Sequence, residues 1–323
     1  MQRIAVVTSG GDAPGMNAAV NAVYRMGDEL GVEVFGVRRG FDGLIEGDIA
    51  PISIEDLEES MQEGGTFLGT ARCVAFEIEE AQLKAVKSLE AKGMEGLIVI
   101  GGSGSQKGTH ALHRHGFPVV GVASTVDNDL YGSDISIGVD TALNTIISSL
   151  DRIRTTAESH RRAFLVQVMG RNYGYLALMS GIASAAEVIV TPEFEMEPEE
   201  VARELHLAHE RGKRYAIAVI ADGAKNNVEK IAGYMREHLD ELDFELRVTI
   251  LGHVQRGGPP TVFDRYLAAR LGSAAVQALS GGKTGVLVGW KYHDVALIPL
   301  EEVVSNRKEL SLDLWRLGQM LAK

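Results

Sequence analysis

The chain has 323 residues, of which 45% are hydrophobic and 24% charged, the composition of a soluble globular protein with room for one large or two ordinary α/β domains. A formal net charge of −12 argues against a nucleic-acid-binding protein, although a local group of arginines can still bind a small anion. The single cysteine excludes an intramolecular disulfide and a cysteine-rich zinc site. No apolar run reaches transmembrane length, so we expect a cytoplasmic protein that binds neither membrane nor nucleic acid.

The first third of the sequence repeats a strand, a glycine-rich loop and a helix. Residues 9–17 and 101–105 are the two loops, and each follows a β-branched run that predicts a buried strand. Glycines let the backbone approach a ligand, and the helix that follows offers free N–H groups to a phosphate. Neither loop has the dinucleotide-binding or P-loop spacing, so ordinary tight turns remain the alternative. The expected strands are 3–8, 33–38 and 96–100, and the expected helices are 18–30, 78–92 and 106–115.

A third strand end carries acidic side chains. The run Val119 to Val122 predicts a strand, and Thr125, Asp127 and Asp129 follow it directly. In an open α/β sheet, ligands bind at the carboxyl ends of the strands, although an Asp- and Asn-rich turn without a ligand explains the same residues. The succession of strands and helices predicts a doubly wound, mainly parallel sheet.

The second half alternates strands and helices in the same way. Arginines (72, 162, 171, 247 and 256) and His253 fall at the ends of these elements in an otherwise acidic chain. Arginine binds phosphate with a bidentate planar group, so their placement indicates anionic substrates, with scattered surface arginines as the alternative. The expected helices are 141–158, 175–185, 199–211, 230–242, 263–279 and 310–321, and the expected strands are 163–168, 187–191, 215–221, 248–251 and 285–289.

These features favour phosphoryl transfer over other chemistries. Phosphoryl transfer requires in-line positioning, neutralised charge and a carboxylate that accepts a hydroxyl proton, which glycine loops, arginines and paired carboxylates supply. The dinucleotide-binding fingerprint is absent, Asp127 has no nearby Ser–His pair, and the nine histidines show no zinc spacing.

With these residues in place, the whole chain resembles the bacterial ATP-dependent 6-phosphofructokinase family. The matching motifs, in order, are TSGGDAPGMNA (8–18), GGTFLGTAR (64–72), GG-x-GS (101–105), TVDND (125–129), MGR (169–171) and LGHVQRGG (251–258). The resemblance implies two similar doubly wound α/β domains with mainly parallel sheets, and a homotetramer. It places ATP and Mg²⁺ in residues 1–138 plus about 255–305, and fructose 6-phosphate in residues 139–254 plus about 306–323.

The same resemblance implies a role for individual residues. Asp127 would take the proton from the sugar 1-hydroxyl, Thr125 and Arg171 would steady the transferred phosphoryl group, and Asp129 would help to hold magnesium. Arg162 and Arg247 would reach the sugar phosphate across a subunit interface. The remaining sugar-site positions are Met169, Gly170, Asp222, His253 and Arg256. The nucleotide positions are Gly11, Arg72, Cys73, Gly102, Ser103, Gly104 and Ser105, and the effector positions, for ADP or phosphoenolpyruvate, are Arg25, Arg154, Glu187, Arg211 and Lys213.

The sequence departs from the family pattern mainly around the nucleotide. Ser103 stands where the family has the aspartate that organises Mg²⁺, and an uncharged hydroxyl should weaken metal and nucleotide binding. Glu77 and Gln82 replace basic residues near the nucleotide phosphates, and Asn21 and Ile54 replace effector-site arginines. The sequence therefore supports two hypotheses: an ATP-dependent 6-phosphofructokinase of reduced rate, or a weakly active or inactive paralogue that binds sugar phosphate or assembles with an active homologue.

Overall fold

The computed structural model describes residues 1–238 and 245–322. The chain forms two compact units, and neither is one continuous stretch. Unit 1 consists of Met1–Thr141 and Arg256–Lys308, and unit 2 consists of Ala142–Gln255 and the described residues from Glu309 on. Among the described helices, none combines the length and apolar character that a membrane span requires.

Unit 1 is built on a sheet that has seven strands in the described part of the chain, in the order β11-β10-β5-β4-β1-β2-β3. The five inner strands are parallel, and β3 and β11 pair antiparallel at the two edges. Strand β4 is buried at every residue, as expected for a strand with helices on both faces. The strands are β1 (Arg3–Ser9), β2 (Glu33–Val37), β3 (Ile49–Pro51), β4 (Gly96–Gly101), β5 (Val119–Ala123), β10 (Val286–Lys291) and β11 (Asp294–Pro299).

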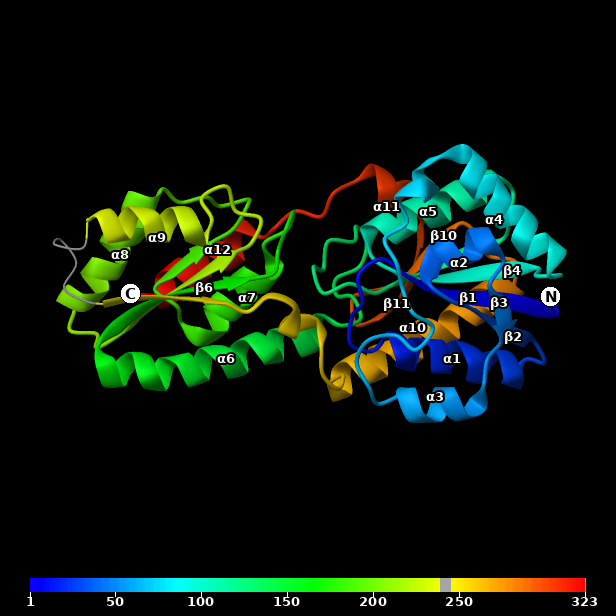
Figure 1. The fold of residues 1–323 in the computed structure, drawn as a ribbon, viewed down its shortest axis with the longest axis horizontal. Helices are drawn as coiled ribbons and strands as arrows, with labels where there is room; N and C mark the ends of the chain where they lie inside the picture. The colour runs from blue at the N-terminus through cyan, green and yellow to red at the C-terminus, as the bar shows by residue number, and fades with distance from the viewer. Residues whose placement is uncertain (239–244, 323) are drawn as a thin grey trace. The chain divides into compact units, whose positions relative to one another are not determined.

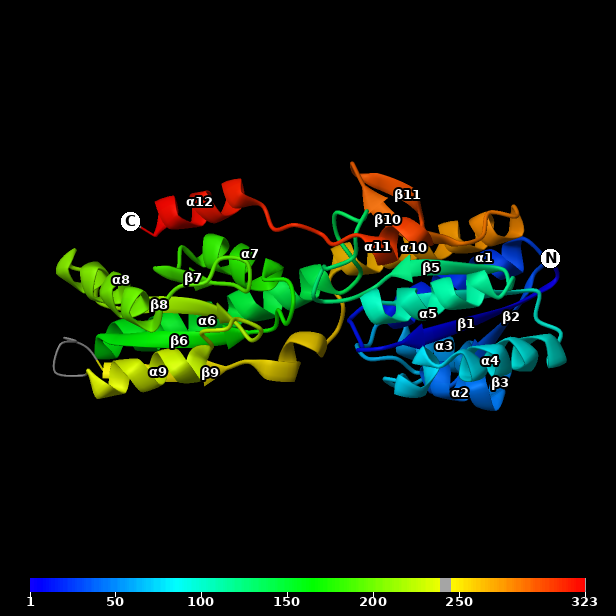
Figure 2. The ribbon, with the colours of Figure 1, turned by 90° about the horizontal axis from the view of Figure 1, so that it is seen from above.

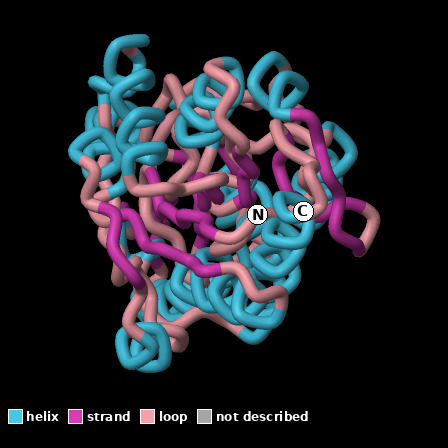
Figure 3. Tube along the Cα trace, turned by 90° about the vertical axis from the view of Figure 1, so that its right-hand side faces the viewer, coloured by secondary structure: helices cyan, strands magenta, loops and turns pink. Residues whose placement is uncertain are grey.

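Helices cover both faces of this sheet (Figures 1 and 3). Helices α1 (Met16–Glu29) and α10 (Val262–Ser280) pack together on one face, with α3 (Ile54–Ser60) beside α1. The other face carries α4 (Glu79–Ala91), α5 (Ser103–Arg114), α2 (Gly40–Glu46) and α11 (Leu300–Ser305), and a 3₁₀ turn, η1 (Val74–Glu77), precedes α4.

Unit 2 holds a smaller sheet, which has four parallel strands among the described residues, in the order β7-β8-β6-β9. Helices α8 and α9 pack together on one face, and α12 packs against α7 on the other (Figures 1 and 2). The strands are β6 (Arg162–Val168), β7 (Val188–Val190), β8 (Ala216–Ala221) and β9 (Glu245–Ile250), and the helical elements are α6 (Val139–His160), α7 (Tyr175–Ser184), α8 (Pro198–Glu210), α9 (Val228–Glu237), η3 (Gly252–Arg256) and α12 (Leu312–Leu321).

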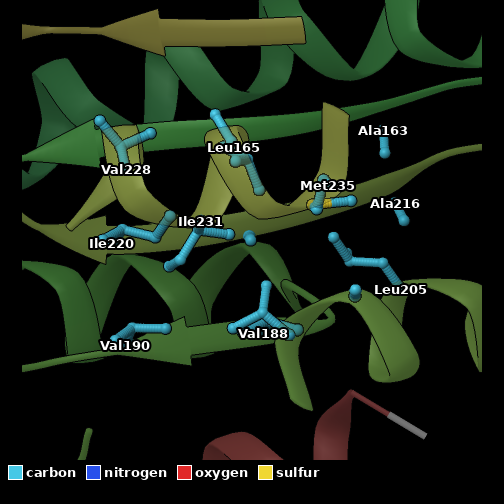
Figure 4. Packing of buried hydrophobic residues seen from close by; sticks show 14 of the residues in the cluster. Ala163, Leu165, Val188, Val190, Leu205, Ala216, Ile220, Val228, Ile231 and Met235 are labelled. Atoms are coloured by element: carbon cyan, nitrogen blue, oxygen red, sulfur yellow. The ribbon is translucent and has the colours of Figure 1, made fainter. Parts of the chain in front are cut away.

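The alternation of side chains along the unit 2 strands produces two separate hydrophobic clusters. Val188 and Val190 of β7 face α8 and α9, where they meet Leu205 and Ile231 (Figure 4). Ile189, between them in sequence, faces the other way and packs with residues of α7. This period of two is what a strand buried on both faces requires.

The fold class expected from the sequence is confirmed, and most predicted elements are present with small shifts at their ends. Helix α5 begins at Ser103, three residues earlier than predicted, so the second glycine loop forms the first turn of the helix. Strand β9 begins at Glu245, so Arg247 lies inside the strand and not before it. Short or edge elements such as α2, α3, β3 and β11 were not predicted, and the expected end of the 230–242 helix lies outside the described residues.

Candidate active site

The two glycine-rich loops of unit 1 meet at the point where the strand order reverses. From β1 the chain proceeds to β2 on one side, and β4 then pairs on the other side of β1. Ser9 and Gly101, the last residues of β1 and β4, are paired in register. A ligand crevice is expected outside the carboxyl ends of strands at such a switch point.

The backbone of the two loops is tightly packed beneath an open surface. A Cβ placed on Gly101 would lie 2.6 Å from both the Ser105 hydroxyl and the Ser9 carbonyl, so no larger residue fits there. A Cβ on Gly104 would meet no atom within 4 Å. Helix α5 therefore presents its first turn to open space, which is the geometry that suits a phosphate.

Ser103 is engaged with one of the two carboxylates expected at this edge. Its hydroxyl donates a hydrogen bond of 2.8 Å to Asp129 Oδ2. The other oxygen, Asp129 Oδ1, is buried and has no hydrogen-bond partner among the described residues. The sequence-predicted Ser103 and Asp129 thus form one polar group at the start of α5.

The segment after β5 positions Asp127. The Asp127 amide donates to the Thr125 hydroxyl at 3.2 Å, which closes a short turn. A Cβ on Gly102 would lie 3.1 Å from Thr125 Cβ, so this turn borders the second glycine loop directly. Asp127 is half-buried at the carboxyl end of β5, beside the open turn of α5.

Arg256 lies over the first glycine loop. Its guanidinium occupies the space that a Cβ on Gly11 would need, so glycine at that position allows the contact. The Arg256 Nη1 atom is 3.8 Å from Asp12 Oδ1, and the Arg256 side chain is mostly buried. The family resemblance assigned Gly11 to the nucleotide site and Arg256 to the sugar site, and within unit 1 the two residues are neighbours.

The other expected nucleotide positions are less constrained. Arg72 is exposed, whereas Cys73 is half-buried, and its burial, together with a hydrogen bond to Asp42, raises the pKa of the thiol to about 11. Gln82 is held by the Phe76 carbonyl at 2.8 Å and by His115 at 3.0 Å, while Glu77 is exposed.

In unit 2, the expected sugar-site residues other than Arg162 and Arg247 follow the carboxyl ends of β6, β8 and β9. The Asp222 amide donates to the Val168 carbonyl at 2.8 Å, which joins the ends of β8 and β6. A Cβ on Gly223 would collide with the Arg171 carbonyl, so the two loops touch through their backbones. Met169 and Gly170 lie in sequence between Val168 and Arg171, the two residues that make these contacts. The side chains of Arg171 and Asp222 are exposed.

Gln255 was not predicted from the sequence, although it organises this edge. Its buried side chain accepts a hydrogen bond from the Met169 amide at 3.1 Å and donates one to the Gly252 carbonyl at 2.8 Å. The side chain therefore joins the loop after β6 to η3, on which His253 stands exposed. A polar residue inside the LGHVQRGG motif was the only sequence signal for it.

Arg162 and Arg247 do not join this group within the chain. Arg162 is the first residue of β6 and Met169 follows its last, so the two are separated by roughly 20 Å of extended strand. Both arginines bind Glu245 (Arg162 Nε to Glu245 Oε2 is 2.6 Å), and the hydrogen bond from Arg162 is the main reason that the pKa of Glu245 is lowered.

The expected effector residues occur in both units. Glu187 is buried and accepts hydrogen bonds from Lys213 Nζ at 2.8 Å and from the Ile217 amide at 2.6 Å. Arg154 and Arg211 of the same unit are exposed. Arg25 belongs to unit 1, where it pairs with Glu58 at 3.0 Å.

The carboxylate of Asp129 is the candidate ligand for a magnesium ion at this edge of the unit 1 sheet. Among the described residues, no three His, Cys, Asp or Glu side chains are grouped as a metal site. Magnesium usually takes one or two carboxylates together with phosphate oxygens and water, and the unpartnered Asp129 Oδ1 beside the Ser103 hydroxyl fits that mode.

Taken together, the fold and the site define a two-unit α/β protein with an open glycine-rich sheet edge in unit 1 and the carboxylate-bearing turn of Asp127 beside it. A family model described as Phosphofructokinase matches residues 3–279, and the chain belongs to that family. Over the whole of both sequences, the chain is 51% identical to ATP-dependent 6-phosphofructokinase 1 of Thermus thermophilus and 47% identical to ATP-dependent 6-phosphofructokinase of Halalkalibacterium halodurans. The family resemblance seen in the sequence is confirmed.

Solved structures of phosphofructokinases are similar to this chain. Phosphofructokinase from Saccharomyces cerevisiae superposes with a TM-score of 0.86 at 37% identity, covering 94% of this chain and 45% of the yeast chain. A pyrophosphate-dependent phosphofructokinase from Marinobacter aquaeolei has the same TM-score at 19% identity, with 100% and 91% of the two chains covered, and supports the fold alone.

Proposed function

We propose that this protein is a 6-phosphofructokinase that transfers the γ-phosphoryl group of ATP to the 1-hydroxyl of fructose 6-phosphate. The observation that carries the proposal is the Thr125–Asp127 turn, which sets a carboxylate directly beside the open first turn of α5. A phosphoryl donor on that turn would have a proton acceptor within its own unit. The names of the full-length relatives support the same reaction.

Asp127 acts as the general base in this scheme. Proton removal from the attacking hydroxyl by a positioned carboxylate contributes roughly 10²–10⁴ to the rate of such reactions. Thr125 holds the Asp127 backbone through its hydroxyl, and the same hydroxyl borders Gly102. Arg171, which is exposed, supplies the positive charge that a phosphoryl group in transfer requires.

Fructose 6-phosphate is assigned to the carboxyl edge of the unit 2 sheet. The loops after β6 and β8 are joined there through Gly223 and Arg171, and Gln255 adds η3 to the group. Asp222 and His253 offer an acceptor and a ring nitrogen to sugar hydroxyls. Arg162 and Arg247 contact the sugar phosphate only if a second copy of the chain supplies them.

Asp129 and Ser103 are the side chains that would hold Mg²⁺. When bound, the ion would neutralise phosphate charge during transfer. Because Ser103 adds a hydroxyl and no charge, we expect weaker metal binding than two carboxylates would provide.

The test is formation of fructose 1,6-bisphosphate from fructose 6-phosphate, ATP and Mg²⁺ by the purified protein, with pyrophosphate as the alternative donor. Turnover with ATP that falls at least 100-fold in Asp127→Asn, while fructose 6-phosphate binding is retained, supports the proposal. Absence of turnover with either donor, together with retained sugar-phosphate binding, would instead identify a non-catalytic paralogue.

Three further expectations rest on the family resemblance and stay predictions. They are assembly as a homotetramer, response to ADP or phosphoenolpyruvate, and a cytoplasmic location. Sedimentation velocity of the purified protein tests the first, and kinetics with each effector tests the second. The buried carboxylate of Glu187 is paired with Lys213. Arg154 and Arg211 are exposed and remain available to bind an anionic effector, which supports an effector site.

A further inference from the structure

Lys308 brings a positive charge to the turn that carries Asp129. It follows α11 in unit 1, and its Nζ donates a hydrogen bond of 2.9 Å to the Asp134 carbonyl. The same oxygen accepts a hydrogen bond of 3.1 Å from Asn128 Nδ2. Because Asn128 is adjacent to Asp129 in sequence, the ammonium group lies beside the carboxylate turn.

The surrounding charges agree with this placement. Burial lowers the pKa of Lys308 to about 8, while the negative charges of Asp134 and Asp129 act in the opposite direction. Near pH 7 the lysine is therefore still mostly protonated. The carboxylates of Asp134 and, to a smaller extent, Asp129 act on this charge. Ser103 offers Asp129 a hydrogen bond without any charge.

We propose that Lys308 is the internal counter-ion of Asp129 and weakens the binding of divalent cations at that carboxylate. The inference rests on the metal-binding role that the proposed function gives to Asp129. An ammonium group in a partly buried site repels a divalent ion much more strongly than it would in water. Lys308 is then a positioning residue that sets the metal affinity of the site, and it does not itself take part in proton transfer.

One oxygen of the Asp129 carboxylate has no hydrogen-bond partner among the described residues. Lys308 donates to Asp134 and not to Asp129 Oδ1, which is buried and unpartnered among the described residues. A cation bound at Oδ1 would therefore share the carboxylate with Ser103 at Oδ2 and would lie near the ammonium group. Competition between two positive charges for one carboxylate is the expected result.

The experiment measures Mn²⁺ binding to the substrate-free, full-length protein by electron paramagnetic resonance, which requires no turnover. We expect Lys308→Met to bind Mn²⁺ roughly tenfold more tightly than the natural chain, a change that corresponds to about 1.4 kcal/mol. Lys308→Arg should restore the natural affinity because it keeps the charge. Arg307→Met is the matched control, since it removes an exposed cation one residue away and should leave the affinity unchanged.

A second pair of variants tests the carboxylate. In an Asp129→Asn background, Lys308→Met should no longer alter Mn²⁺ affinity. Equal affinity in the natural chain and in Lys308→Met, or no measurable binding in either, overturns the proposal. The same holds if Arg307→Met tightens binding as much as Lys308→Met does. Should Lys308→Met not fold, as judged by circular dichroism, Lys308→Gln replaces it. A failure of the turnover assay with altered Mn²⁺ affinity would refute the proposed reaction and leave this inference standing.

Discussion

The Asp264 carboxylate accepts hydrogen bonds of 2.8 Å and 2.5 Å from the amide and the hydroxyl of Thr141. Its other oxygen accepts one of 2.8 Å from the Gly138 amide. Asp264 belongs to α10 and is fully buried, so a residue distant in sequence satisfies the free N–H groups at the start of α6. Burial is nevertheless the largest influence on this carboxyl and raises its pKa to about 6.

The first prediction concerns stability and pH. A carboxyl whose pKa is raised in the folded state binds its proton more tightly there than in the unfolded chain. It therefore contributes stability below about pH 4 that is lost as the pH rises through 6. Between pH 5 and 7 this loss should amount to roughly 1.4 kcal/mol, the equivalent of one pKa unit. Thermal unfolding of the natural chain against Asp264→Asn, which does not titrate, measures it.

The exposed Asp28 supplies the control for that experiment. Asp28→Asn should follow the pH profile of the natural chain, whereas Asp264→Asn should lack the decline between pH 5 and 7. Parallel profiles for all three proteins would contradict the assignment.

The second prediction compares two glycines of unit 2. Gly223→Ala should destabilise the protein by about 1–3 kcal/mol, because the new Cβ would collide with the Arg171 carbonyl. Displacement of Arg171 should also lower kcat. Gly233→Ala, in the middle of α9 with no atom near the new Cβ, should instead stabilise the protein by up to about 1 kcal/mol. Chemical denaturation and steady-state kinetics report the two effects, and a Gly223→Ala protein as stable as Gly233→Ala would show that the backbones can separate.

The third prediction concerns Gln255. In Gln255→Leu the part-buried Met169 amide and Gly252 carbonyl lose their partners, at a cost of up to about 1–3 kcal/mol each. Because these groups join the loop after β6 to η3, the KM for fructose 6-phosphate should rise while the KM for ATP stays near its natural value. Gln277→Leu, at an exposed position on α10, is the control. Parallel increases in both KM values would mean that the substitution disturbs more than this edge.

The fourth prediction concerns Ser103. Replacement by aspartate sets a second carboxylate where the hydroxyl now donates to Asp129, so without metal the two like charges should lower the melting temperature. Addition of Mg²⁺ should then raise the melting temperature more in Ser103→Asp than in the natural chain. Ser103→Asn introduces a side chain of the same size as aspartate without its charge, so Mg²⁺ should not raise its melting temperature more than that of the natural chain. Equal Mg²⁺ responses in Ser103→Asp and Ser103→Asn would argue that the charge at 103 does not contact the ion.

The sequence was sufficient to predict the fold because its signals are local. The β-branched runs at 3–8, 96–100 and 119–122 form β1, β4 and β5 as expected. The sequence also indicated that Thr125 and Asp127 follow the carboxyl end of β5, and their part in phosphoryl transfer stays a prediction.

Contacts between segments distant in sequence could not be predicted in this way. Gln255 is hydrogen-bonded to Met169, which is 86 residues away, and Lys308 is hydrogen-bonded to Asp134, which is 174 residues away. No periodicity in the sequence connects such pairs. Edge strands such as β11 were missed for a similar reason. Only Ile298 of its six residues is buried, so the segment shows no clear alternation of buried and exposed positions, and pairing with β10 makes it a strand.

The order in which the chain builds its two units has a consequence for synthesis on the ribosome. All four described strands of unit 2 have been synthesised once Ile250 has left the ribosome. In unit 1, by contrast, β5 pairs with β10, which is synthesised more than 160 residues after the end of β5. Until then β5 has an unpaired edge, the kind of surface that recruits other chains. A nascent or truncated chain that stops before Val286 should therefore require a chaperone for unit 1, while the four described strands of the unit 2 sheet are already paired.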